Sequence, residues 1–289
     1  MTTTPPATAP TQRMEPALPA AVQESGGTSA DGRMYVVGGY DASRSSTATV
    51  WVFDGRTWQA GPALPLRLNH PGVAALAGDV YVAGGFTPDG QASTRVFVLR
   101  RGTLQWTELP AMHRPRGALA LVAVSGALLA IGGRAGTQQI GVGERFDPAT
   151  RVWSDLPAMP SPRNHLAGYV EGGRACVAGG RTPATTGGVD CYDPITNGWI
   201  AVPPLAVPTS GAGAAVLPDE PVVMGGETAN ETSILGIVQW LAGSAWSQTP
   251  MLVPRHGVAA AVFEGRVWAC GGATAPGFHA VADCTSLGR

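Results

Sequence analysis

The 289-residue sequence contains no lysine, and all 19 of its basic residues are arginine. We attribute this first to a high-GC, bacterial coding bias and only second to a choice of arginine for bidentate anion binding. The net charge is −1, so the chain lacks the basic surplus that is typical of nucleic-acid-binding proteins. We therefore expect no nucleic-acid partner.

Long apolar runs are missing as well. No stretch approaches the length of a membrane-spanning helix, and the opening MTTTPPATAPTQRM contains no apolar core of a secretory signal. We therefore expect a cytoplasmic protein without a membrane partner. The four cysteines are too few for a disulfide framework, so we interpret them as buried thiols, with cross-strand disulfides as the alternative. Residues 1–8 are rich in Thr, Pro and Ala, which predicts a flexible arm.

The short motifs of common catalytic sites are also absent: a Gly-rich phosphate loop, a nucleophile elbow, HExxH and paired carboxylates. What the chain has in excess is glycine and proline, with 40 and 25 residues. Because no G-X-Y period accompanies them, they indicate many tight turns.

An apolar run that ends in Gly-Gly recurs six times along the chain. The leading glycines lie 46–48 residues apart, and five of the pairs are followed 20–22 residues later by a tryptophan. Two repeats also contain an aromatic-Asp-Pro turn, Phe146–Pro148 and Tyr192–Pro194. The leading glycines are Gly38, Gly84, Gly132, Gly179, Gly225 and Gly271, and the tryptophans are Trp58, Trp106, Trp153, Trp199 and Trp246. Features that recur in step predict a repeat architecture.

Each repeat fits four short antiparallel strands, with Gly-Gly ending the second strand, where a missing Cβ permits close backbone approach. This set of features resembles the Kelch signature and extends over about residues 20–285. The resemblance implies an all-β fold, a six-bladed β-propeller of four-stranded antiparallel blades. We assign it to residues 9–289 as a single domain.

The sixth repeat lacks a tryptophan and stops soon after its third strand, expected at Ala280–Thr285. Near the other end of the chain, Met14–Pro19 resembles the fourth-strand ending Ala60–Pro65. We therefore expect the N-terminal segment, about residues 9–17, to supply strand d of the last blade. Such closure removes the free sheet edges of an open array.

One face of this propeller carries the candidate site. In a four-stranded meander the b–c and d–a connections lie on the same face, and all five histidines fall in these connections. The register places the d–a loops and the residues after each Gly-Gly around the mouth of the central channel. The candidate ligand-binding residues are Arg67, Arg116, Arg134, Arg163, Arg181 and Arg255.

Two interpretations of these arginines stay open. Kelch repeats commonly carry an arginine in the d–a loop, where it bonds neighbouring carbonyl groups and has a structural role. In the functional interpretation the arginines form a cationic funnel for a carboxylate, a phosphate or an acidic peptide. The Kelch resemblance favours such a partner, because eukaryotic Kelch proteins bind acidic peptide segments on this face. The expected function is recognition of an acidic protein segment or a small anionic ligand by a monomer.

An enzyme is the alternative: an isomerase, cyclase or lyase acting on an anionic metabolite at the same funnel. The resemblance implies that such chemistry is compatible with the scaffold, because bacterial Kelch propellers that epimerise sialic acid exist. A purely structural scaffold is the third interpretation. The candidate catalytic residues are His70, His165, His256, Glu24, Glu227 and Tyr40.

We expect no cofactor, with a metal ion as the alternative. His70, His165 and His256 belong to alternate blades, so three imidazoles converging on the axis would suit an open metal site. Against this, His256 is one residue out of register. No metal-binding spacing of His or Cys supports the site either.

Overall fold

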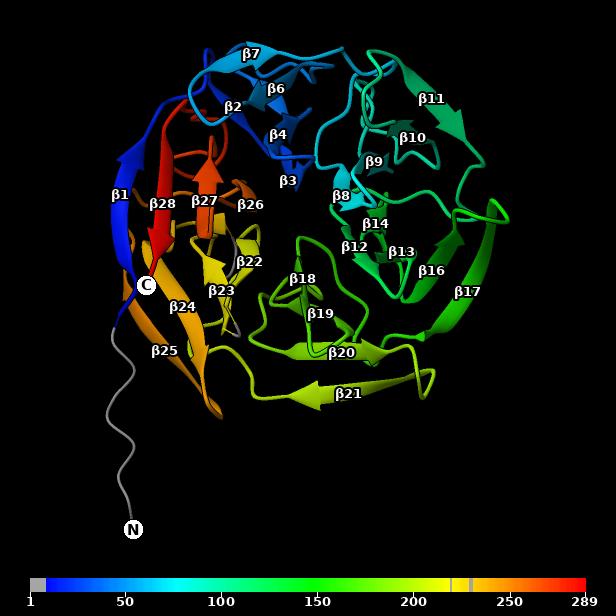
Figure 1. The fold of residues 1–289 in the computed structure, drawn as a ribbon. Helices are drawn as coiled ribbons and strands as arrows, with labels where there is room; N and C mark the ends of the chain where they lie inside the picture. The colour runs from blue at the N-terminus through cyan, green and yellow to red at the C-terminus, as the bar shows by residue number, and fades with distance from the viewer. Residues whose placement is uncertain (1–8, 219, 229–230) are drawn as a thin grey trace.

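The computed structural model describes residues 9–218, 220–228 and 231–289. In these residues six four-stranded antiparallel sheets surround a central axis as the blades of a propeller (Figure 1). No α-helix occurs in the same residues, and accordingly no helix there is long and apolar enough to cross a membrane. The prediction of an all-β, six-bladed propeller is confirmed. The expected arm, residues 1–8, lies outside the described residues.

Each blade is a meander that runs from an innermost strand beside the channel to an outermost strand on the wall (Figure 1). Blades 1 to 3 consist of β3 (Gly26–Ala30), β4 (Arg33–Val37), β6 (Val50–Phe53), β7 (Trp58–Ala60); β8 (Gly72–Leu76), β9 (Asp79–Ala83), β10 (Val96–Leu99), β11 (Trp106–Leu109); and β12 (Ala120–Val124), β13 (Ala127–Ile131), β16 (Val142–Asp147), β17 (Val152–Ala158).

Blades 4 to 6 repeat the same order. They consist of β18 (Ala167–Glu171), β19 (Arg174–Ala178), β20 (Val189–Asp193), β21 (Gly198–Val202); β22 (Gly213–Leu217), β23 (Glu220–Met224), β24 (Ile237–Ala242), β25 (Ala245–Pro250); and β26 (Ala259–Phe263), β27 (Arg266–Cys270), β28 (Cys284–Gly288), β1 (Thr11–Glu15). Four two-residue strands pair in the loops: β2 (Val22–Gln23) with β5 (Tyr40–Asp41) and β14 (Arg134–Ala135) with β15 (Gln138–Gln139).

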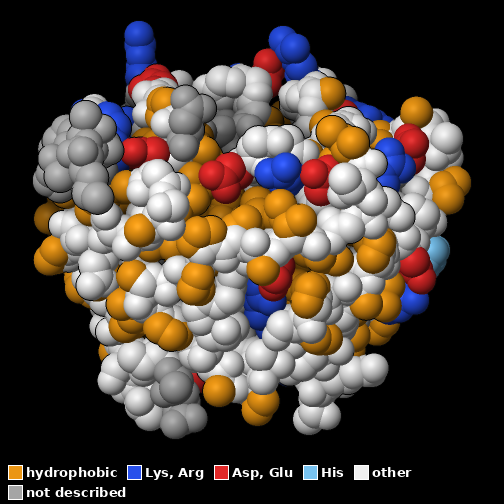
Figure 2. Space-filling view, turned by 90° about the horizontal axis from the view of Figure 1, so that it is seen from below, with side chains coloured by type: hydrophobic (Ala, Val, Ile, Leu, Met, Phe, Trp, Pro, Cys, Tyr) orange, Lys and Arg blue, Asp and Glu red, His pale blue; other side chains and the backbone are white. Residues whose placement is uncertain are grey.

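The hydrophobic core lies between the blades. It consists of six clusters of buried side chains, and each cluster joins residues of two neighbouring blades. Seen from the side, the outer wall carries hydrophobic side chains in patches, and acidic side chains lie beside basic ones (Figure 2). The core therefore holds each blade to its neighbours around the whole ring.

The chain closes as predicted, because β1 pairs with β28. Thr11 lies opposite Gly288, and Glu15 lies opposite Cys284. The third strand of this blade was expected at Ala280–Thr285 but lies at Cys284–Gly288. The reason is that Ala280 and Val281 form isolated bridges to Ala273 and Val22 near the channel before the strand begins.

A tryptophan clamp connects successive blades. In five blades the indole Nε1 of the repeat tryptophan donates to a proline carbonyl oxygen of the preceding blade at 2.8–2.9 Å. These prolines recur every 46–48 residues, and the bonded pairs are Trp58–Pro16, Trp106–Pro62, Trp153–Pro110, Trp199–Pro157 and Trp246–Pro203. The tryptophan and the proline turn of the repeat are thus two halves of one contact.

The closing strand has no tryptophan, and Gln12 takes over the contact. Its Nε2 donates to the carbonyl oxygen of Pro250 at 2.7 Å, and its Oε1 accepts from the N–H of Leu252 at 2.8 Å. Pro250 is the sixth proline of the series, since it follows Pro203 by 47 residues. The ring therefore has six equivalent interblade bonds, five from indoles and one from an amide.

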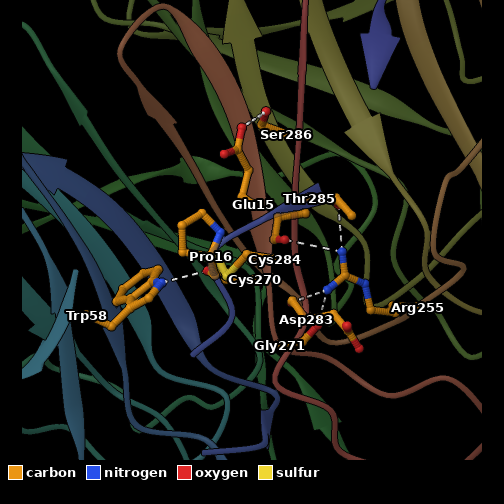
Figure 3. The surroundings of a disulfide bond; sticks show 11 residues. Glu15, Pro16, Trp58, Arg255, Cys270, Gly271, Asp283, Cys284, Thr285 and Ser286 are labelled. Atoms are coloured by element: carbon orange, nitrogen blue, oxygen red, sulfur yellow. Dashed lines mark hydrogen bonds between the residues drawn. A yellow bond between two sulfur atoms is a disulfide. The ribbon is translucent and has the colours of Figure 1, made fainter. Parts of the chain in front are cut away.

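The interpretation of the cysteines as thiols is wrong. All four are buried as expected, but Cys176 is bonded to Cys191 and Cys270 to Cys284, the latter shown in Figure 3. The members of each pair lie directly opposite each other on neighbouring antiparallel strands, so their sulfur atoms can meet. The sequence did not reveal this opposition, because it depends on how many loop residues separate strands b and c.

Candidate functional site

A closed ring of backbone hydrogen bonds surrounds the channel on the face of the b–c and d–a loops. Six residues in equivalent positions of the d–a loops form it, and we call it the channel ring. The N–H of each residue donates to the carbonyl oxygen of its equivalent in the preceding blade, at 2.7–3.1 Å. In chain order the six are Glu24, His70, Ala118, His165, Gly211 and Gly257, and Glu24 closes the ring by donating to Gly257.

All six backbones are left-handed, with φ between 50° and 64°. Glycine suits this conformation, whereas Cβ-bearing residues adopt it at a cost of about 1–2 kcal/mol. Strain of this kind is concentrated at functional sites. Glu24, His70 and His165 nevertheless occupy three of the six positions, so their side chains are the first candidates for a function here.

These side chains line a cavity of about 400 Å³ at the mouth of the channel, which we call the mouth cavity. It also contains residues from the loops that follow Gly-Gly, among them Tyr40, Arg134, Arg181 and Glu227. The structure thus brings together all six residues suggested above as catalytic candidates, since His256 lines the cavity as well. Their role in a reaction stays a prediction.

Glu24 is at the centre of this group. Its Oε2 lies 3.1 Å from Nε2 of His70, and its Oε1 lies 3.1 Å from Nδ1 of His256. Burial by itself raises the pKa of Glu24, but the charge and hydrogen bonds of the two histidines outweigh it and hold the pKa well below its ordinary value. Glu24 is therefore a carboxylate near neutral pH.

The ring of His165 packs edge-on against the ring of His70, with 4.9 Å between the ring centroids. Burial lowers the pKa of His165 well below its ordinary value, and the nearby charges of His70 and Arg181 lower it further. His165 is therefore a neutral imidazole, with a nitrogen lone pair to offer. Burial, aided by the charge of Glu24, raises the pKa of the neighbouring Tyr40.

Glu227 and His256 form a second polar pair in the cavity, 3.4 Å apart at Oε1 and Nδ1. Burial raises the pKa of Glu227, with the charge of Glu24 acting in the same direction. Burial by itself lowers the pKa of His256, but the hydrogen bond and charge of Glu24, together with Glu227, raise it. Arg181 is bonded to Glu227 at 3.3 Å and also contacts Glu231, so its charge is already balanced.

Arg134 differs from Arg181. Its Nη1 donates to the carbonyl oxygen of Gly136 at 2.8 Å, and its guanidinium carbon lies 4.7 Å from the ring centroid of Phe86. In the described part of the chain no carboxylate pairs with it. Arg134 is thus a positioned cation in the cavity with N–H donors to spare.

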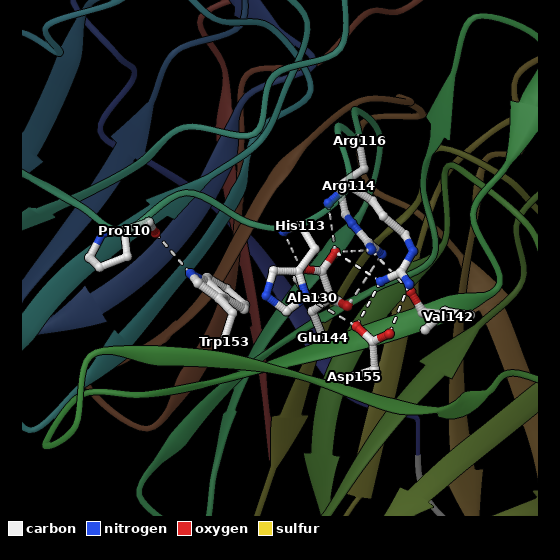
Figure 4. A network of polar contacts seen from close by, with 9 residues as sticks. All are labelled: Pro110, His113, Arg114, Arg116, Ala130, Val142, Glu144, Trp153 and Asp155. Carbon is white, nitrogen blue, oxygen red and sulfur yellow. Dashed lines mark hydrogen bonds and ion pairs between the residues drawn. The ribbon is translucent and has the colours of Figure 1, made fainter.

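The other predicted arginines lie elsewhere. Arg116, Arg163 and Arg255 are fully buried, and each donates to the carbonyl oxygen of the first glycine of its own blade's Gly-Gly pair, at 2.7–3.0 Å. This agrees with the structural interpretation of these arginines. Figure 4 shows the other partners of Arg116, which are the carbonyl oxygens of Ala130 and Val142 and the carboxylate of Glu144. Arg67 is exposed and does not line the mouth cavity.

Two asparagines in the site were missed from the sequence. Asn69 and Asn164 precede His70 and His165, and the side-chain Oδ1 of each faces Nδ1 of its histidine, at 2.6 Å in the first pair. The signal was present as the dipeptide Asn-His, which occurs at the same register position in blades 2 and 4. The two equivalent loops thus repeat both the histidine and the asparagine that orients it.

Comparison with known proteins bears on the fold. The Kelch motif matches residues 24–65, 67–113 and 115–160. The solved structure of YjhT is 17% identical, has a TM-score of 0.82, and is matched over 93% of this chain and 95% of that chain. At 17% identity, this similarity shows that the two proteins share a fold and does not extend to function. No curated protein sequence matches the chain.

Proposed function

We propose that this chain, which is a Kelch-repeat β-propeller, binds a small anionic ligand in its mouth cavity. The fold supports binding of a ligand or a protein in general, but a fold shared by many functions does not choose between them. The choice has to come from the side chains of the cavity.

The observation that carries the proposal is the state of Arg134. Its guanidinium lies in the cavity, is held by Gly136 and Phe86, and has no carboxylate partner among the described residues. A guanidinium with free donors recognises carboxylate or phosphate oxygens in a bidentate manner. Because the guanidinium is already held in position, binding costs less conformational entropy.

The cavity favours a small anion over an acidic peptide. Its volume of about 400 Å³ falls within the range of about 300–1,000 Å³ that small-molecule sites occupy. Among the described residues, Arg134 is the cavity arginine without a carboxylate partner, whereas Arg181 is paired with Glu227 and Glu231, so the cavity offers a guanidinium to one anionic group rather than to several. Gln23 and Gln139 offer amide groups to a polar, uncharged part of the ligand.

Isothermal titration calorimetry with a panel of small carboxylates and phosphates tests this. We expect one ligand per chain for the members that fit, and a loss of affinity of about 10–100-fold in Arg134→Gln, as for one charge-assisted bond. Arg67→Gln is the matched control, because it removes the same charge from an exposed site outside the cavity. Equal affinities of the two variants, or no binding of any panel member, would contradict the proposal.

Acid–base catalysis on the bound anion is the second candidate function. It is favoured by the number of proton-exchanging side chains in the same cavity as Arg134, including Tyr40, Glu227 and His256. Members of the panel that bind are incubated in deuterated water and followed by NMR for conversion or hydrogen exchange. An enzyme loses about 100-fold or more of its turnover in Glu227→Gln while binding persists. No conversion of any bound ligand would eliminate this candidate.

A further inference from the structure

Three side chains of the channel ring converge from blades 1, 2 and 4. Glu24, His70 and His165 each offer one ligand atom, and these atoms lie within 4.8 Å of one another. The sequence had suggested three histidines, but His256 is not part of this group. It lies instead between Glu24 and Glu227.

The asparagines determine which nitrogen each histidine presents. Nδ2 of Asn69 donates to the carbonyl oxygen of Phe86 and to Oγ of Ser46, so its Oδ1 has to face His70. An amide oxygen only accepts, and Nδ1 of His70 therefore carries the hydrogen. In blade 4, Nδ2 of Asn164 donates to Gln139, and its Oδ1 faces Nδ1 of His165 in the same way. Both histidines are left with Nε2 as the free lone pair.

The contact between His70 and Glu24 then needs a cation. Nε2 of His70 and Oε2 of Glu24 are 3.1 Å apart. An imidazole lone pair and a carboxylate oxygen are both acceptors, and two acceptors at that distance repel each other. Only a proton or a metal ion between them makes the arrangement favourable.

The surroundings of these three residues resemble the outer shell of a metal site. Histidine ligands of metals donate their other N–H to an oxygen atom, and carboxylate ligands are themselves hydrogen-bonded. Here Asn69 and Asn164 serve the two histidines, and Nδ1 of His256 contacts Oε1 of Glu24 at 3.1 Å. All three ligands are therefore oriented before any ion arrives.

We propose that Glu24, His70 and His165 bind a divalent transition-metal ion of the zinc class at the channel ring. Two imidazoles and one carboxylate form a known ligand set for such ions, with further coordination positions left open. Zinc–nitrogen bonds of about 2.0–2.1 Å place neighbouring tetrahedral ligand atoms about 3.3 Å apart. The contact between His70 and Glu24, at 3.1 Å, is already close to this spacing, and the ligand atoms of all three residues lie within 4.8 Å of one another. All three residues line the mouth cavity.

This inference goes beyond the proposed anion binding and does not depend on it. Metal binding is measured in a buffer without phosphate or carboxylate, so the two proposals can fail separately. Where both hold, an anion held by Arg134 shares the cavity with the ion.

The experiment uses the full chain after treatment with a chelator and exchange into chelator-free buffer. Calorimetry with Zn²⁺ is expected to give one site per chain, and Co²⁺ is expected to give the visible absorption of a low-coordinate complex. His165→Ala abolishes both signals. Asn164→Ala, which removes only the orienting partner, weakens the affinity about 10–100-fold. His279→Ala, which changes an exposed histidine outside the cavity, leaves binding unchanged.

Two glycines of the channel ring provide a matched pair that changes no ligand. A Cβ on Gly257 would lie 2.5 Å from Oε1 of Glu24, whereas a Cβ on Gly211 would meet nothing closer than 3.9 Å. The two have nearly equal φ, 62° and 64°, so their backbone strain is the same. We expect Gly257→Ala to weaken metal binding and Gly211→Ala to leave it unchanged, and melting temperatures in chelator measure any difference in stability between the two variants.

The proposal is overturned if the wild-type chain takes up no Zn²⁺ or Co²⁺. In that case no metal ion bridges the contact between His70 and Glu24. Uptake that survives His165→Ala, or equal affinities of the two glycine variants, overturns it as well, because the ion then lies elsewhere.

Discussion

Arg116 donates a hydrogen bond to Glu144 across 2.6 Å, and neither side chain is exposed to solvent. Arg116 lies in the loop before blade 3, and Glu144 lies on β16 of that blade (Figure 4). The backbone N–H groups of His113 and Arg114 also donate to the carboxylate of Glu144. The pair thus fastens a loop of the functional face to the interior of its blade.

Removing one partner of this pair should be costly. Glu144→Ala leaves the guanidinium of Arg116 buried without its counter-ion, and we expect the free energy of unfolding to fall by about 3–5 kcal/mol. Urea denaturation measures it. The matched control is Glu108→Ala, which removes an exposed pair with Arg95 and should cost less than about 1 kcal/mol. Similar losses in both variants would contradict a structural role for the buried pair.

The two disulfides should contribute nearly equally. They span 15 and 14 residues, and loops of this length correspond to about 3 kcal/mol of stabilisation each. We expect the double variants Cys176→Ala/Cys191→Ala and Cys270→Ala/Cys284→Ala to lose about that much in urea denaturation. A marked difference between the two losses would show that loop length is not what matters.

The same cysteines test the expected cytoplasmic location. Disulfides persist in oxidising compartments and are rare in a reducing cytoplasm. Cells are lysed in an alkylating reagent, and the modified cysteines are counted by mass spectrometry. Because both disulfides are present in the structure, we expect no alkylated cysteine, which would contradict the cytoplasmic location. Four alkylated cysteines per chain would agree with that location and contradict the disulfides.

The closing strand should be indispensable. Deleting residues 1–15 removes the five residue pairs between β1 and β28 and both bonds of Gln12. At about 0.5–1.5 kcal/mol for each hydrogen bond, we expect several kcal/mol of lost stability and aggregation through the freed edge. Light scattering and thermal melting detect both. A chain that lacks only residues 1–8 is the control, because none of these contacts is removed.

Stability should fall on the alkaline side because of Tyr169. Burial raises the pKa of its phenol, so the folded state keeps the proton to a higher pH than the unfolded chain, whose tyrosines titrate near pH 10. Stability from this group is complete below pH 10 and is lost as the pH rises above it. Melting temperatures between about pH 8 and 11 should therefore decline less steeply in Tyr169→Phe. If melting temperature falls equally with pH in the wild type and in Tyr169→Phe, Tyr169 is not the cause of the alkaline loss.

At pH 7 the same variant should be as stable as the wild type or more so. The hydroxyl of Tyr169 is buried and finds no hydrogen-bond partner in the described residues. Removing an unsatisfied buried group costs nothing and can be favourable. A large loss of stability in Tyr169→Phe at pH 7 would indicate that the hydroxyl makes a favourable contact.

The sequence predicts the blades well because their signals are local and periodic. Gly-Gly and Trp recur in step, and even the closure could be inferred, since Met14–Pro19 resembles the ending of another fourth strand. The shift of the last third strand could not be foreseen, because Ala280 is held by Ala273 across the loop. The disulfide pairing likewise depends on the length of the loop between strands b and c, which the repeat pattern does not predict.

The candidate site was predicted in part, for a physical reason. Register alone assigns a residue to the channel mouth, which is why Glu24, His70 and Glu227 meet there. Register does not say which way a long side chain turns. Arg116 and Arg134 both lie on the functional face, yet one guanidinium turns into its blade and the other lines the cavity.

The closure by β1 also sets an order of events during synthesis. Residues Thr11–Glu15 leave the ribosome long before their partner strand Cys284–Gly288 is made. Gln12 likewise has to wait for Pro250. Blades 1 to 5 can form while the chain grows, whereas β1 stays without its partner until β28 has been made.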